Sequence, residues 1–251
     1  MPRRIGRAAR IGTALAALWP AAAGAVIGGR DEGGTLARRS VMVLDSRGGV
    51  CSGIVVARDA VLTAAHCVTG ATEQRVHFRD GDGQPVLIQP AARAVHPGYD
   101  AAAIERRRRS IDLALLRLPG PLPARFETAS LSATAAPRDE RVTLGGFGVL
   151  REGDWRSTGT FRTASLGVVE PYGPSRILLW AQDPDRAGAG ACRGDSGGPI
   201  LRGQAVVAVT TWATGARGTD CGAFTQGVLL GPQRDWIDRT LREWGRQAAW
   251  E

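Results

Sequence analysis

The feature that most constrains the fold of this chain is a series of short strand-like runs between residues 40 and 212. Each run is rich in β-branched or aliphatic residues and is broken by Gly, Asp or Pro, a pattern typical of an all-β protein. The runs are SVMVL, GIVVA, RVHF, PVLI, ALLRL, RVTLGGFG, ILLWA and QAVVAVTTW. Residues 233–244 differ, because their apolar side chains recur at helical spacing and predict a C-terminal helix.

The first 25 residues have the pattern of an export signal. A basic start precedes an apolar run at residues 11–19, which is followed by a proline and the small residues AAAGA. We expect cleavage between Ala25 and Val26; a buried N-terminal helix is the alternative. The apolar run is too short to span a bilayer. The arginine pair at residues 3–4 lacks the rest of a twin-arginine signal, so the general secretory route is expected. The sequence therefore predicts a secreted or periplasmic protein.

The charge of the chain does not predict a nucleic-acid-binding protein. The net charge is +8, but the first 25 residues hold four arginines and no acid, so the mature chain keeps +4. No stripe of alternating aromatic and basic residues accompanies this charge. All 32 basic residues are arginine, which is more typical of genomic bias than of a binding surface. Binding of a polyanion stays an alternative, and it predicts a clustered patch with strong salt dependence.

The four cysteines are expected to form disulfides, because an exported chain meets an oxidising compartment. Four cysteines allow three pairings. Cys51 and Cys67 flank one short segment, and Cys192 and Cys221 flank another, so local pairing is favoured. The chain has no CxxC motif, and we expect neither a zinc site nor any other metal or cofactor.

Ser196, in GACRGDSGGP at residues 190–199, is either part of a glycine-rich turn or a nucleophile. A serine hydroxyl needs a base, and histidine has a suitable pKa. All three histidines precede Ser196. The α/β-hydrolases carry their histidine after the serine, so the order here disfavours that class and leaves the order His, Asp, Ser.

His66 is the best candidate for the base, since it lies in LTAAHC directly before a cysteine that can anchor it. His77 lies in a strand-like run and His96 begins a turn, and both are interpreted as structural. Asp112 is the candidate acid, because it leads the buried run of SIDLALLRL. A carboxylate there is kept from water and can orient the imidazole.

Six motifs occur in the order and spacing of one family: VIGG at residues 26–29, LTAAHC, AVHPGYD, DLALLRL, GDSGGP and TTW. The chain resembles the trypsin-like, chymotrypsin-fold serine proteases from Val26 to the final helix. The resemblance implies two six-stranded antiparallel β-barrels and a C-terminal helix, at about residues 26–125, 126–232 and 233–245. It also implies a secreted serine endopeptidase, which we expect to be bacterial and monomeric. Its partners would be protein or peptide substrates, with no nucleic acid, and no membrane once the signal is removed.

The resemblance assigns roles by position. Ser196 would attack the scissile carbonyl, His66 would take its proton, and Asp112 would orient the histidine. The backbone N–H groups of Gly194 and Ser196 would form the oxyanion hole. The residues assigned to substrate binding are Gly190, Ala191, Arg193, Thr211, Trp212, Ala213 and Gly227.

The resemblance also implies two disulfides and an activation contact. Cys51–Cys67 would brace the histidine loop, and Cys192–Cys221 would brace the specificity pocket. The new N-terminal amine of Val26 would pair with Asp195 and hold the oxyanion loop in its active form. Signal cleavage alone would then activate the enzyme.

Several positions depart from the family pattern. Gly190 stands at the pocket floor, where trypsins carry an aspartate, so we expect substrates with an uncharged, apolar P1 residue (the residue before the scissile bond). Asp220, next to Cys221, is an alternative source of a carboxylate. Arg193 and the run ERRRR at residues 105–109 either are solvated or contact the substrate; the run would select acidic residues. An inactive, protease-like binding protein is a further alternative.

Overall fold

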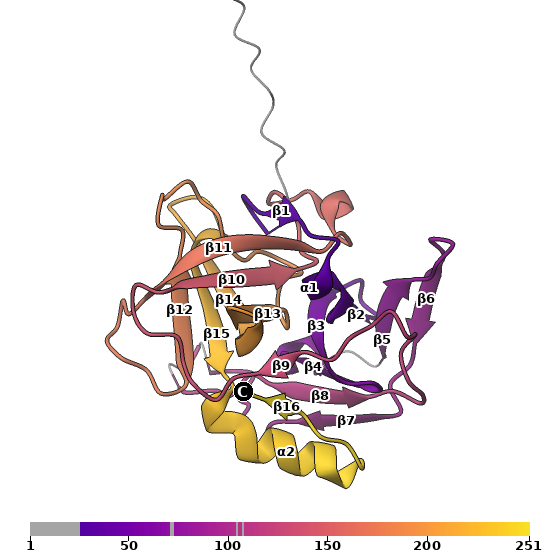
Figure 1. Ribbon diagram of the computed structural model, residues 1–251. Coiled ribbons are helices and arrows are strands. Elements are labelled where there is room, and N and C mark those ends of the chain that lie inside the picture. Colours follow the sequence, from indigo (N-terminus) through magenta and orange to yellow (C-terminus); the bar gives the residue numbers. More distant parts are fainter. Residues whose placement is uncertain (1–25, 71–72, 104, 107) are drawn as a thin grey trace, which may run out of the picture.

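The computed structural model describes residues 26–70, 73–103, 105–106 and 108–251. The predicted export signal lies outside these residues. Within them the strands form two mainly antiparallel sheets, which lie side by side in Figure 1 above helix α2 (Arg234–Glu243). None of the helices in this part of the chain is long and apolar enough to cross a membrane. The predicted all-β fold with a C-terminal helix is confirmed.

The first sheet is closed into a barrel by the chain itself. Its strand order is β6-β5-β2-β3-β4-β8-β7, so the two ends are strands that follow each other in sequence. Only residues 89–91 separate them, and Pro90 among these cannot donate to the ladder. One barrel strand is thus interrupted, which gives seven segments for six expected strands. Their bounds are β2 Ser40–Asp45, β3 Val50–Ala57, β4 Ala60–Thr63, β5 Gln74–Arg79, β6 Pro85–Ile88, β7 Ala92–Val95 and β8 Ala114–Arg117.

The second sheet contains a closed ring of six strands. The order β13-β10-β11-β12-β15-β14 returns to β13 through an additional pairing between β13 and β14. The bounds are β10 Arg141–Gly146, β11 Arg162–Val169, β12 Leu178–Gln182, β13 Pro199–Arg202, β14 Ala205–Gly215 and β15 Gly222–Leu229. Three two-residue strands extend the ring: β1 Arg30–Asp31, β9 Ser130–Leu131 and β16 Ala249–Trp250. Because β1 pairs with β11, the start of the described chain joins the second barrel.

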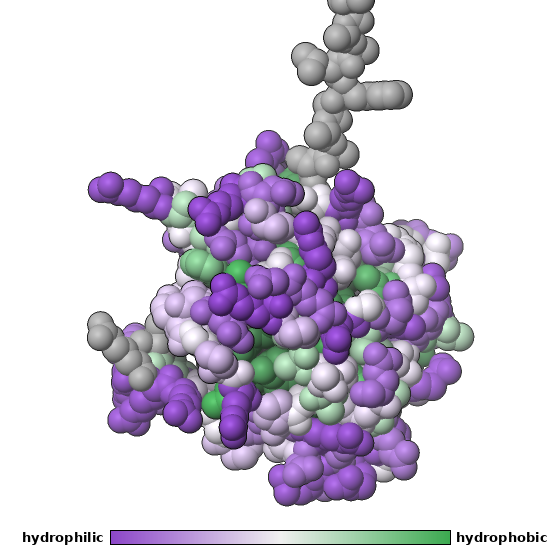
Figure 2. All heavy atoms as spheres, turned by 60° about the vertical axis from the view of Figure 1, so that its left-hand side comes forward, coloured by the Kyte–Doolittle hydropathy of each residue, from purple (hydrophilic) through white to green (hydrophobic). Residues whose placement is uncertain are grey.

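One apolar core joins the two barrels to the C-terminal helix. Leu113 and Leu115 from the first barrel, Val206 from the second and Ile237 from α2 belong to the same buried cluster. Burying an aliphatic side chain of this size contributes about 1.5–3 kcal/mol. The barrels therefore share a core that fixes their relative position. On the face shown in Figure 2, hydrophilic side chains dominate and hydrophobic ones are exposed only in small patches between them.

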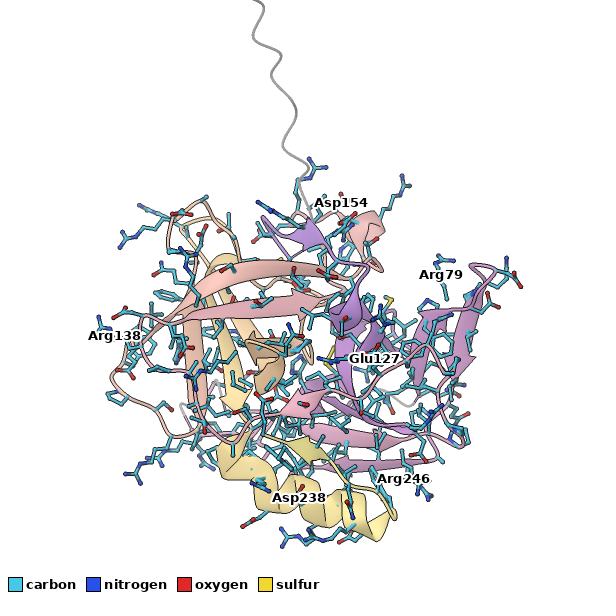
Figure 3. All side chains as sticks on the ribbon, viewed as in Figure 1. Arg79, Glu127, Arg138, Asp154, Asp238 and Arg246 are labelled. Carbon is cyan, nitrogen blue, oxygen red and sulfur yellow. A yellow bond between two sulfur atoms is a disulfide. The ribbon has the colours of Figure 1, made fainter. Side chains whose placement is uncertain are left out.

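Polar contacts hold the segments that connect or follow the barrels. Arg246, labelled in Figure 3, follows α2 and makes two hydrogen bonds of 2.6 and 2.7 Å to Asp59, between β3 and β4. The hydrogen bond from Arg246 holds the pKa of the Asp59 carboxyl below its usual range. The hydrogen bonds to Asp59 therefore hold the chain after α2 against the first barrel.

The remaining short helices are α1 Thr35–Arg38, η1 Ala65–Cys67, η2 Trp155–Ser157 and η3 Gly231–Gln233.

Candidate active site

The register of two neighbouring strands brings His66 and Asp112 together. Strand β4 pairs with β8 so that Thr63 lies opposite Ala114. His66 follows the end of β4 in the helical turn η1, and Asp112 precedes the start of β8. The histidine Nδ1 lies 2.6 Å from Asp112 Oδ2, and its backbone N–H donates to Asp112 Oδ1 at 2.9 Å. A carboxylate can only accept at Nδ1, so this contact favours the tautomer that carries its proton on Nδ1 and leaves the Nε2 lone pair for a proton from a nucleophile.

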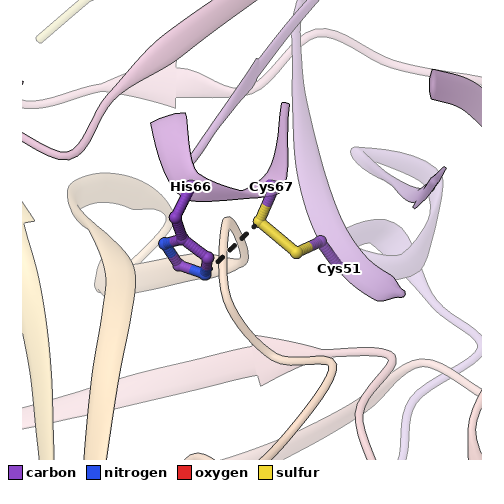
Figure 4. A group of neighbouring side chains, drawn as sticks. All are labelled: Cys51, His66 and Cys67. Atoms are coloured by element: carbon purple, nitrogen blue, oxygen red, sulfur yellow. Dashed lines mark hydrogen bonds between the residues drawn. A yellow bond between two sulfur atoms is a disulfide. The ribbon is translucent and has the colours of Figure 1, made fainter. Parts of the chain in front are cut away.

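The predicted disulfide Cys51–Cys67 is present and lies beside this histidine. Figure 4 shows the imidazole next to the bridge, with Nε2 3.7 Å from Cys67 Sγ. The adjacent Ala64 and Ala65 are fully buried. The backbone that carries His66 is therefore held by a covalent bond and by packing on both sides.

Ser196 lies in the segment that leads into β13, and the first barrel anchors this segment through Ser52 on β3. The Ser52 N–H donates to the Ser196 carbonyl at 2.7 Å, and the Ser52 hydroxyl donates to the Gly194 carbonyl at 2.9 Å. The same hydroxyl accepts the Phe147 N–H at 2.9 Å. Ser52 is fully buried. Sequence reasoning missed this residue, because nothing in the sequence indicates a contact across 142 positions.

The loop before Ser196 requires glycine at position 194. Gly194 has φ +99°, and a Cβ there would lie 2.7 Å from the Gly148 Cα. Both conformation and space therefore exclude a side chain. In the described part of the chain, the Gly194 and Ser196 N–H groups donate to no protein acceptor. Two free donors in one tight loop have the chemistry of an oxyanion hole.

Asp195 is fully buried, and its surroundings supply two neutral donors. Its carboxylate accepts the N–H groups of Gly148 and Cys192, each at 2.9 Å. Burial raises the pKa of Asp195 to about 7, although these hydrogen bonds and the nearby Arg162 oppose that shift. Val26 is also fully buried, and the next residue bridges to Gly190. A positive charge placed near Asp195 would therefore stabilise the ionised form of its carboxyl group.

A cleft of about 1350 Å³ contains all three candidate catalytic side chains, His66, Asp112 and Ser196. The predicted residues Arg193, Thr211, Trp212 and Ala213 also line it. Beyond Thr210, strand β14 pairs with β15 on one side, and its residues 211–215 line the cleft. Tyr172 and Trp180 extend the wall: their rings are in edge-to-face contact with centroids 5.4 Å apart, and Trp180 is in edge-to-face contact with Trp212 at 6.0 Å. Sequence reasoning missed these two aromatic residues.

Three residues assigned to the pocket lie behind the cleft wall. Ala191 is buried and donates its N–H to Thr225 Oγ1 at 2.9 Å. A Cβ on Gly190 would lie 3.2 Å from the same oxygen, and one on Gly227 would lie 2.7 Å from Ile200 Cδ1. Their contact with substrate stays a prediction. The nearest polar side chain, Thr225, is neutral.

The arginine run borders the cleft through Arg108 and Arg109, and Arg176 lines it from another loop. The three side chains are exposed. Among the described residues, none of them forms an ion pair with a carboxylate.

The second predicted disulfide, Cys192–Cys221, is also present. Val142 is buried, and Arg202 pairs with Glu140 at 2.8 Å.

The described residues include two groups of potential metal ligands, and both contain a disulfide. One consists of His66 with Cys51 and Cys67, and the other of Glu152 with Cys192 and Cys221. Disulfide sulfurs are not thiolates, so each group offers one ionisable ligand rather than a donor set.

Two β-barrels with a His–Asp pair and a serine in the cleft define the class of chymotrypsin-fold hydrolases. The comparisons with known proteins agree. The family model Trypsin matches residues 26–237. Vitellin-degrading protease of Bombyx mori is 28% identical over 86% of this chain and 85% of its own length. Trypsin-like protease of Streptomyces glaucescens is 28% identical, with coverage of 90% and 89%.

Solved structures show the same fold. Neuropsin, a serine protease expressed in the limbic system of mouse brain, matches with a TM-score of 0.72 at 22% identity, over 86% of this chain and 99% of its own. Human heparin binding protein matches with a TM-score of 0.73 at 21% identity, over 89% and 100%. The chain belongs to the trypsin family. It is a serine endopeptidase that acts on protein or peptide substrates.

Proposed function

We propose that the chain cleaves peptide bonds through Ser196, His66 and Asp112, with an acyl-enzyme intermediate. The observation that carries this proposal is the 2.6 Å contact between His66 Nδ1 and Asp112 in a cleft that Ser196 also lines. His66 Nε2 takes the serine proton as Ser196 Oγ attacks the scissile carbonyl, and then gives it to the leaving amine. Asp112 stabilises the imidazolium, and the Gly194 and Ser196 N–H groups stabilise the oxyanion.

A serine-directed covalent probe tests this mechanism. The secreted chain should be labelled once, at Ser196, with loss of peptidase activity. The matched control Ser196→Ala should stay unlabelled and inactive, yet keep the parent's circular dichroism and unfolding midpoint. Labelling of Ser196→Ala at the parent rate would overturn the proposal. An unlabelled, inactive parent would instead favour a binding protein.

We further propose that the P1 residue is uncharged and apolar. Burying an arginine or lysine side chain needs a paired acid, and the groups around the predicted floor are Gly190, Ala191 and the neutral Thr225. The carboxylate of Asp220 is already bonded to Arg193 at 3.2 Å. Cleavage of a peptide series that varies only at P1 should show higher kcat/KM for Ala, Val or Leu than for Arg or Asp. A preference for P1 Arg in the parent would contradict this.

We also propose a secreted, bacterial, monomeric enzyme that signal cleavage itself activates. The support is the export pattern before Val26, the Streptomyces relative and the environment of Asp195. The ammonium of a free Val26 would supply the positive charge that the buried carboxylate lacks. N-terminal sequencing of fully active secreted material should read Val26-Ile27-Gly28; an earlier start would rule out this form of activation.

A further inference from the structure

Two exposed side chains of opposite charge meet at the wall of the cleft. Arg193 precedes the oxyanion loop, and Asp220 lies between β14 and β15. Arg193 Nη2 and Asp220 Oδ2 are 3.2 Å apart, and both residues line the cleft that holds Ser196. Their side chains are 61% and 74% exposed. An isolated pair with this exposure contributes little, so its persistence depends on what holds the two residues together.

The neighbouring disulfide and a glutamate hold this pair in place. Arg193 directly follows Cys192 and Asp220 directly precedes Cys221, and the two half-cystines are disulfide-bonded with their Cα atoms 5.1 Å apart. The covalent bond keeps the two backbone segments together, so the pair loses only the rotamer freedom of its two side chains. Glu152 Oε1 accepts the N–H groups of Asp220 and Cys221, each at 2.6 Å. The backbone under Asp220 is therefore anchored independently of its side chain.

The pairing determines what charge a substrate side chain meets. The Asp220 carboxylate is compensated by Arg193, and the guanidinium of Arg193 is compensated by Asp220. The predicted floor is neutral as well, since Thr225 is the polar group beside Gly190 and Ala191. A charged P1 side chain thus finds no free counter-charge in this part of the cleft and loses its hydration without compensation.

We propose that Arg193 and Asp220 form a specificity strap that makes the enzyme reject P1 side chains of both signs. The proposal rests on the proposed endopeptidase function and deepens it. Removing one member leaves the other charge uncompensated in the cleft. Arg193→Ala exposes a carboxylate and selects basic P1 residues, whereas Asp220→Ala exposes a guanidinium and selects acidic ones. The double variant has no charge at either position and returns to uncharged P1 residues.

Four enzymes test the strap: the parent, the two single variants and the double variant. Each is given peptides that differ only at P1, with Arg, Glu or Leu, and charged-to-Leu ratios of kcat/KM cancel general losses of activity. Arg193→Ala should raise the Arg-to-Leu ratio about 2- to 5-fold, and Asp220→Ala should raise the Glu-to-Leu ratio by a similar factor. Both gains should shrink in high salt, and the double variant should match the parent.

The control is Arg138→Ala, which removes a similarly exposed ion pair with Asp139, at 3.6 Å, away from the cleft. Its ratios should equal those of the parent. Unchanged ratios in both single variants of an active enzyme would overturn the strap and leave the endopeptidase function intact. A parent that cleaves none of the peptides and does not react with a serine-directed probe would overturn the proposed function itself.

Discussion

The two disulfide-bonded regions of this molecule are held in different ways. In the histidine region, closed by Cys51–Cys67, the two alanines before His66 are fully buried. The register of β4 and β8 sets the distance between His66 and Asp112. The pocket region, closed by Cys192–Cys221, relies on an exposed ion pair, a glutamate and a turn at residues 216–219. With the proposed function, this comparison predicts that changes in the buried packing affect the reacting groups, whereas changes in the exposed polar contacts affect substrate choice. Substrate choice should therefore be the easier property to change.

The largest effect is expected in the histidine region. His66→Ala removes the base for every substrate, so kcat should fall by about 10⁴- to 10⁶-fold for all P1 residues alike. The exposed imidazole is not part of the core, so the unfolding midpoint should stay near the parent value. Steady-state kinetics and urea unfolding measure both. A loss of kcat confined to some P1 residues would contradict the assignment of His66 as the general base.

A second large effect concerns the amine of Val26. A variant that keeps one extra residue before Val26 cannot place its ammonium beside Asp195, so the oxyanion loop loses support. We expect kcat to fall about 10²- to 10³-fold, the cost of losing an oxyanion donor. Parent enzyme with a free Val26 is the control. Equal activity in the two forms would contradict the expectation.

The same pair of proteins should differ in pH dependence. In the extended form Asp195 has a pKa of about 7 against 3.8 as its ordinary value. Because its folded-state pKa is raised, the contribution of Asp195 to the stability of the extended form is largest below pH 4 and is lost as the pH rises to 7, by about 4 kcal/mol in all. The free amine, or Asp195→Asn in the extended form, should remove this dependence. Urea unfolding between pH 4 and 8, in a Ser196→Ala background, measures it.

Removal of each disulfide compares the regions directly. The bridges close segments of 16 and 29 residues, so replacing either pair with serine should cost a similar amount, about 3–4 kcal/mol. Their effects on activity should differ. Without Cys51–Cys67, kcat should fall for every peptide; without Cys192–Cys221, the ratios between P1 residues should change. The same change in P1 ratios for both variants would contradict this assignment.

A smaller effect is expected from Ser52. Ser52→Ala removes the hydroxyl that bonds the Gly194 carbonyl and the Phe147 N–H, and leaves the buried carbonyl and the partly buried N–H without this partner. We expect a loss of about 1–3 kcal/mol in stability and about tenfold in kcat with little change in KM, since the loop that serves the transition state is disturbed. Ser52→Thr, which keeps the hydroxyl, should recover part of kcat. A change in KM alone would indicate a different role.

The smallest effect is expected at the arginine run. Arg108 and Arg109 are exposed, so replacing both with alanine should change stability by less than about 0.5 kcal/mol. If they are solvated, kcat/KM for acidic and neutral peptides should change by less than about twofold. A selective loss for acidic peptides that salt abolishes would show that these arginines select substrate.

The sequence by itself determined the fold class and the identity of the candidate reacting groups. Strand-forming runs separated by Gly and Pro required a sheet, and each run falls on a strand in the structure. The expected runs do not include the barrel strands β4, β7, β11, β13 and β15, because the place of these short or polar strands depends on neighbours distant in the chain. The order of the histidines before Ser196, with motifs around each group, narrowed the chemistry to one class.

Only the tertiary structure decided how the cleft is supported and lined. The contact from Ser52 to Gly194 spans 142 positions, and the pairing of Arg193 with Asp220 depends on a disulfide that folds two loops together. Tyr172, in the loop between β11 and β12, and Trp180, on β12, reach the cleft wall from a segment that shows no sign of function in the sequence. Local patterns report propensity and burial, whereas the partner of a polar side chain is set by which distant segments the barrels bring within hydrogen-bonding distance.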